Sequence, residues 1–84
     1  MKEQIIRFIP MTERYPGAFE ECLLLEKNGG LTAGCWISTG EENKEGNFYQ
    51  GRHGVYGKEY ILAWVAIEKF DLAKGDRIIF YYDG

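Results

Sequence analysis

The residues of this sequence best suited to binding chemistry lie in a glycine-spaced segment, Gly51-Arg52-His53-Gly54-Val55-Tyr56-Gly57. Arginine binds phosphate or carboxylate groups in a bidentate manner, and glycine lets the backbone approach a ligand closely. Arg52 and His53 could therefore bind a small anionic ligand, such as a nucleotide or another metabolite. The alternative is an exposed turn without a ligand. A pocket at this loop, within one chain or between protomers, would be lined by Arg52, His53, Tyr49 and Tyr56.

The only two cysteines, Cys22 and Cys35, could form a redox pair or serve as small buried hydrophobic residues. Two cysteines are too few for the disulfide framework of a small secreted domain, so we expect reduced thiols in the cytoplasm. A two-residue turn at Asn28-Gly29 would place the two cysteines directly opposite each other on paired strands. They would then be close enough to oxidise, whereas a turn at Gly29-Gly30 would separate them.

Catalytic signatures are missing from the sequence. It contains one histidine and no phosphate-binding loop, dinucleotide-binding motif or metal-ligand spacing. The adjacent residues Glu20 and Glu21 would point to opposite faces of a strand, which argues against a carboxylate pair for acid and base catalysis. We therefore predict that the protein is not an enzyme and that it needs neither a cofactor nor a metal.

Charge and composition narrow the choice of partners. The net charge is −3 and no basic run occurs, so nucleic acid is not an expected partner. The N-terminal apolar run is interrupted by Arg7 and is followed by Pro10, a pattern unlike that of a signal peptide or a spanning segment. Neither membrane insertion nor secretion is expected. With 84 residues and 45% hydrophobic content, the chain is predicted to fold as a single domain, residues 1–84.

Glycine and proline divide the sequence into short apolar segments that are typical of strands. The strongest local signal is Asn28-Gly29, a dipeptide suited to a hairpin turn between two apolar segments. A helical turn is plausible only over residues 69–76, with Asp71 as its cap. The predicted fold is all-β or β-rich α+β, a small antiparallel sheet of about six short strands with its central hairpin at Asn28-Gly29. The expected strands span residues 4–9, 19–27, 31–38, 48–50, 60–67 and 77–82.

Aromatic residues suggest how such a sheet could bind a partner. Trp36 and Trp64 lie in otherwise apolar strands, so core packing explains them better than a binding pocket does. The last strand contains Tyr81, and at a sheet edge it would offer backbone groups to another chain. An interior position for this strand is equally compatible with the sequence. We expect a non-catalytic interaction module that binds a protein, or a second copy of itself, through an aromatic sheet edge or face.

Residues 9–17, Ile-Pro-Met-Thr-Glu-Arg-Tyr-Pro-Gly, resemble the opening of domain-of-unknown-function family 551. Members of that family begin with a Trp-Ile-x-Val-x-x-x-Leu-Pro pattern and continue with a strand, a glycine turn, a second strand and a closing His-Trp-Met-Pro. This sequence has Phe8 where the family has its first tryptophan, and Ala63 and Ala66 replace the histidine and the proline. The resemblance implies a small β-rich domain of phage, prophage or bacterial origin without an established activity. Its further matches are residues 23–25, 28–30, 34–36, Phe48 and Trp64.

Overall fold

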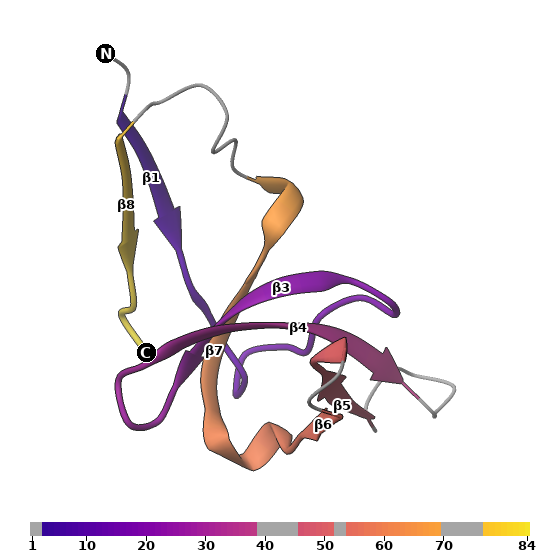
Figure 1. Cartoon of the computed structure of the whole chain (residues 1–84). Coiled ribbons are helices and arrows are strands. Elements are labelled where there is room, and N and C mark those ends of the chain that lie inside the picture. The colour runs from indigo at the N-terminus through magenta and orange to yellow at the C-terminus, as the bar shows by residue number, and fades with distance from the viewer. Residues whose placement is uncertain (1–2, 39–45, 52–53, 70–76) are drawn as a thin grey trace.

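The computed structural model describes residues 3–38, 46–51, 54–69 and 77–84 of the chain. Its regular elements are short strands and two turns of 3-10 helix, so the predicted β-rich fold is confirmed (Figure 1). In chain order they are β1 (Glu3–Arg7), β2 (Ile9–Pro10), β3 (Glu21–Glu26), β4 (Leu31–Ser38), β5 (Gly46–Tyr49), β6 (Val55–Tyr56), η2 (Lys58–Tyr60), β7 (Ile61–Ala66), η3 (Ile67–Lys69) and β8 (Arg77–Tyr81).

Six of these strands form one sheet in the order β2-β7-β3-β4-β5-β6, and every neighbouring pair in it is antiparallel. The apolar segment predicted as a strand over residues 60–67 forms β7 of this sheet. It pairs with β2 on one side and β3 on the other, as expected for a strand that is apolar at every position. Strand β6 was not expected, because Val55 and Tyr56 lie within a segment predicted to be a loop. They pair with β5 in a short hairpin that is closed by a hydrogen bond from the Gln50 N–H to the Gly54 carbonyl oxygen.

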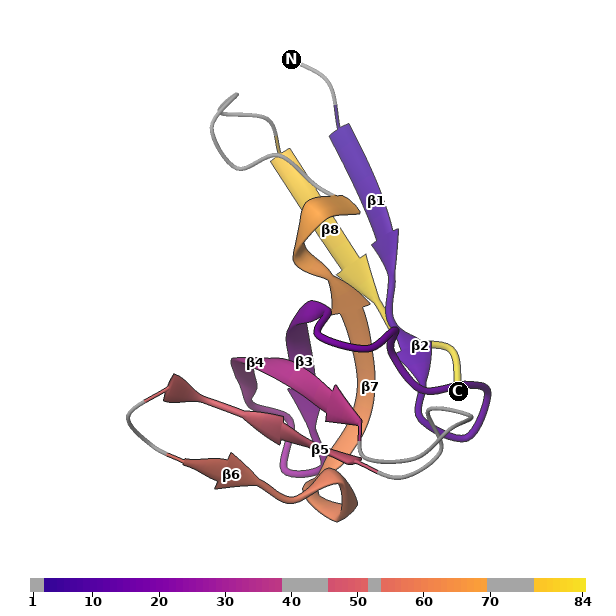
Figure 2. The ribbon, with the colours of Figure 1, turned by 90° about the vertical axis from the view of Figure 1, so that its right-hand side faces the viewer.

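The first and last strands form a separate two-stranded pair, β1 with β8, and this pair is parallel. The expectation of a purely antiparallel sheet was therefore incomplete. Figures 1 and 2 show the pair extending away from the six-stranded sheet, and we call it the arm. The predicted first strand is split at Phe8 between β1 in the arm and β2 in the main sheet. The predicted helical turn falls mainly on residues 70–76, which lie outside the described residues.

The central hairpin forms at the predicted place but in a different register. The Gly29 N–H donates to the Glu26 carbonyl oxygen, and the Glu26 N–H donates to the Gly30 carbonyl oxygen, each at 2.9 Å. Gly29 alone in this turn has a positive φ, of 90°, whereas a type I′ turn needs two such residues. The loop therefore contains three residues and ends in a glycine bulge.

This longer loop overturns the predicted cysteine pairing. Cys22 lies opposite Gly34, and Cys35 lies opposite Glu21. Because side chains alternate along a strand, the one-residue shift places the two cysteines on opposite faces of the sheet. The prediction that they face each other was wrong.

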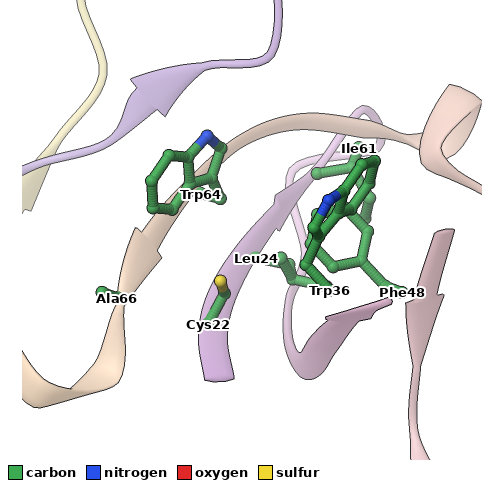
Figure 3. Packing of buried hydrophobic residues seen from close by; sticks show 7 residues of the cluster. All are labelled: Cys22, Leu24, Trp36, Phe48, Ile61, Trp64 and Ala66. Atoms are coloured by element: carbon green, nitrogen blue, oxygen red, sulfur yellow. The ribbon is translucent and has the colours of Figure 1, made fainter. Parts of the chain in front are cut away.

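The inner face of the main sheet carries the larger core (Figure 3). The Trp36 ring contacts the rings of Tyr15 and Phe48, with centroids 5.2 Å and 5.0 Å apart. The loop after β2 covers this face, and its Arg14 places a guanidinium over Trp64 and accepts a hydrogen bond from the indole through its carbonyl oxygen. The predicted core role of both tryptophans is confirmed. The buried members are Cys22, Leu24, Trp36, Phe48, Ile61, Trp64 and Ala66.

The outer face of the sheet is only partly covered. Over β7 and β3, Ala63 and Val65 are buried together with Phe8, whose ring lies 5.5 Å from that of Phe80 at the base of the arm. Over β4, β5 and β6, large apolar side chains stay exposed, including Leu31, Tyr49 and Val55. This part of the outer face therefore exposes apolar side chains that a closed core would bury.

Candidate functional site

Of the residues predicted to form a binding site, the structure describes the three tyrosines, and these lie on different faces or elements. Arg52 and His53 lie outside the described residues. Tyr49 and Tyr56 occupy opposite faces of the β5–β6 hairpin, because Tyr49 pairs with Val55, and Tyr56 pairs with the buried Phe48. Tyr81 lies in β8, on the arm. The three tyrosines therefore do not share one surface, since nearness in sequence does not fix which face of a strand a residue occupies.

Tyr56 has a structural role instead. Its hydroxyl donates a hydrogen bond to a carboxylate oxygen of Glu26, and its ring packs edge-on against Tyr60 with centroids 5.9 Å apart. The hydrogen bond to Glu26 raises the pKa of the Tyr56 phenol, and burial of the hydroxyl adds to the effect. These contacts tie the last strand of the sheet to the end of β3.

Tyr49 belongs to a row of outward-facing residues that crosses four strands. Glu21 pairs with Cys35, Cys35 with Tyr49, and Tyr49 with Val55. Cross-strand partners share a face, so these side chains lie side by side on the outer face. Tyr49 remains 45% exposed at the centre of this row.

Two adjacent hollows lie along this side of the sheet. The first, of about 300 Å³, has Cys35, Tyr49 and Gly51 in its lining. The second, of about 490 Å³, is lined by Phe19 and three carboxylates, those of Glu20, Glu21 and Glu68. Glu21 and Ile67 line both hollows, so the two form one continuous surface. We call this surface the outer patch and define it by Phe19, Glu21, Cys35, Tyr49, Val55 and Ile67.

Phe19 is one of the residues of the outer patch that sequence reasoning missed. It was expected inside a strand, yet it precedes β3 with a positive φ of 61° and is 71% exposed. Its N–H donates to the Trp36 carbonyl oxygen at 2.8 Å, and this bond holds the unusual backbone in place. No local signal marks the position, because a left-handed backbone at phenylalanine runs against residue preference.

The two thiols have different environments. Cys22 is fully buried, and burial followed by the charge of Glu20 raises the pKa of its thiol to about 12. Cys35 is only half-buried, and burial together with the carboxylate of Glu21 raises the pKa of its thiol. Both thiols are therefore protonated near neutral pH, and Cys35 alone is within reach of a reagent.

Thiol labelling should separate the two cysteines. Burial raises the pKa of the Cys22 thiol to about 12, so almost none of it is thiolate at neutral pH, and burial also keeps the reagent away. We expect a single label per native chain, at Cys35, and two labels in denaturant. Mild oxidation should form no bond between the two cysteines. Peptide mass spectrometry checks both results, and an internal Cys22–Cys35 disulfide formed without unfolding would contradict the observed register.

No family model, no curated protein and no solved structure matches this chain. The resemblance to domain-of-unknown-function family 551 therefore stays a prediction. In the described parts of the chain, no group of three or more His, Cys, Asp or Glu side chains is arranged to hold a metal ion. No helix among the same residues has the length and apolar character needed to cross a membrane.

Proposed function

We propose that this protein is a non-catalytic interaction module that binds another protein through the outer patch. The observation that carries the proposal is the joining of two hollows by Glu21 and Ile67, with the exposed rings of Phe19 and Tyr49 beside them. Exposed aromatic side chains beside a concave surface are common at protein interfaces, where they supply much of the binding energy.

The charges of the outer patch indicate the chemistry of the partner. Three carboxylates line the hollow beside Phe19, and among the residues that the structure describes no lysine or arginine lines either hollow. A partner segment that carries lysine or arginine beside an apolar side chain would complement this arrangement. The charges would raise the association rate and the apolar contacts would supply most of the affinity.

Three further parts of the proposal concern the location, the origin and an alternative ligand. Free Cys22 and Cys35 agree with a reducing compartment, which supports a cytoplasmic location. An origin in phage or bacterial genomes rests on the family resemblance alone. The alternative of a small anionic ligand at Arg52 and His53 also stays a prediction, and Gly51, which precedes them, lines the smaller hollow.

Comparative capture from a lysate of the producing cells tests the outer patch. The immobilised protein should retain a partner that the Tyr49→Ser variant loses by about tenfold or more, since an interface aromatic commonly contributes about 2 kcal/mol. Glu21→Gln should weaken retention less, and added salt should reduce retention by the wild type. Purified partner and calorimetry then give the affinities.

The matched control is Tyr60→Ser. Tyr60 is 59% exposed, and its ring packs against Tyr56 rather than lining the outer patch. This variant should retain the partner as the wild type does. Equal retention by the Tyr49→Ser variant, or an equal loss in the Tyr60→Ser variant, would contradict the proposal.

A further inference from the structure

The arm is an incomplete sheet. It consists of one parallel pair, β1 with β8, and neither strand pairs with a third in the described parts of the chain. Two strands alone are marginally stable in water, and parallel pairing is weaker than antiparallel pairing. The arm nevertheless presents Ile5 at 65% exposure. An additional strand beside it would stabilise the pair and cover this residue.

The backbone of β1 offers hydrogen-bonding groups on its outer side. The Phe8 N–H donates to the Tyr81 carbonyl oxygen at 2.8 Å, so by alternation the even-numbered residues of β1 direct their backbone groups toward β8. The backbone N–H and carbonyl groups of Glu3, Ile5 and Arg7 then point away from β8. In Figure 2 no described element lies beyond β1 on that side.

From this geometry we infer that β1 pairs antiparallel with β1 of a second copy, about a two-fold axis at Ile5. In this register Ile5 lies opposite its own symmetry mate, and Glu3 lies opposite Arg7 of the second copy. All three outward-pointing residues then exchange backbone hydrogen bonds. A shift by two residues in either direction would leave one of them without a partner and would place Ile5 opposite a charged residue. The outer patch takes no part, so this inference is independent of the proposed function.

The side chains of one arm face are self-complementary in this register. Ile5 pairs with Ile79 within the arm, so the central row of the four-stranded sheet would consist of isoleucines alone. On each side of it, Glu3 would lie between Arg77 of its own chain, 3.6 Å away at present, and Arg7 of the second copy. Alternating charges across neighbouring strands favour pairing, whereas like charges oppose it.

Arg7 already has two acidic partners, Glu13 at 2.9 Å and Asp83 at 3.1 Å. They hold its side chain at the base of the arm and leave it partly exposed. Glu3 of the second copy would add a third carboxylate there, so the ion pairs mainly select the register and the backbone and isoleucine contacts supply the affinity. The arm points away from the main sheet (Figure 1), which places the two sheets at opposite ends of the dimer.

Disulfide trapping at the axis tests the register. In a Cys35→Ser background, Ile5→Cys would bring two thiols together at a hydrogen-bonded pair, where Cα atoms lie about 5.5 Å apart, a separation that a disulfide spans. Mild oxidation should convert this variant to a covalent dimer at least about tenfold more efficiently than the Gln4→Cys control. Gln4 lies on the other face of β1 and away from the axis. Efficient cross-linking through Gln4→Cys, or none through Ile5→Cys, would overturn the inference.

Charge exchange provides a second test that uses no thiol. In sedimentation experiments from about 1 µM to about 1 mM, the range of weak interfaces, the wild type should dimerise reversibly. Glu3→Lys and Arg7→Glu should each weaken self-association by about tenfold, because like charges would then face each other. An equal mixture of the two variants should associate more strongly than either variant alone, because both cross-strand pairs then join opposite charges. A monomeric wild type, or a mixture that associates no better than its components, would contradict the pairing.

Discussion

Replacing Trp36 with alanine is expected to lower the free energy of unfolding by about 3–5 kcal/mol. The Trp36 side chain is fully buried on the inner face, between the rings of Tyr15 and Phe48. Its loss would leave a cavity at the point where the loop after β2 closes over the sheet. For a chain of 84 residues the total stability is about 4–13 kcal/mol, so this loss would be a large fraction of the total. Urea denaturation followed by tryptophan fluorescence and circular dichroism measures the change.

The control for this prediction is Leu31→Ala. Leu31 is an exposed apolar residue at the start of β4, and truncating it should change stability by no more than about 0.5 kcal/mol. A Trp36→Ala variant as stable as the wild type would show that the inner face is not the main core.

Adding a methyl group at Gly46 should destabilise the β4–β5 pair by about 1–3 kcal/mol. A Cβ at this position would overlap the carbonyl oxygen of Ile37 and lie 3.0 Å from a ring carbon of Trp36. Neither neighbour can move freely, since one is backbone in a strand and the other is a buried ring. Gly46→Ala should therefore lower the urea midpoint and increase amide hydrogen exchange in β5.

Gly51→Asn is the matched control for this steric effect. Gly51 has a positive φ of 56°, which asparagine tolerates, and no atom of another described residue beyond its chain neighbours lies within 4 Å of an added Cβ. This variant should keep nearly all of the wild-type stability. If Gly46→Ala proves no more destabilising than Gly51→Asn, the close approach of β5 to β4 is wrong.

Much of the main sheet could be predicted because its signals are local. Asn28-Gly29 between apolar segments identified the hairpin of β3 and β4, and the uninterrupted apolar segment around Trp64 identified β7. The register could not be predicted, since Asn28-Gly29-Gly30 supports either a two-residue or a three-residue loop. The backbone conformation at Gly29 decides between the two loop lengths. The longer loop shifts the pairing of β3 with β4 by one residue, so every residue of β3 has a different partner from the predicted one.

The arm and the outer patch depend on contacts between distant parts of the sequence. Nothing near residues 77–81 indicates that they pair in parallel with β1 at the other end of the chain. The outer patch likewise brings Phe19, Ile67 and Tyr49 together from three separate segments. Tyr49 was predicted to take part in binding together with Tyr56. The two side chains lie on opposite faces of the β5–β6 hairpin, because side chains alternate along a strand.

The most direct test of binding through the outer patch is site-specific photo-crosslinking in the producing cells. A photoreactive phenylalanine analogue would replace Tyr49 in one variant and Tyr60 in another, with crosslinked products identified by mass spectrometry. The structure predicts a defined adduct with another protein from position 49, through a partner segment that contains lysine or arginine, and none from position 60. No adduct from position 49, or the same adducts from both positions, would contradict the assignment of the outer patch as the binding surface.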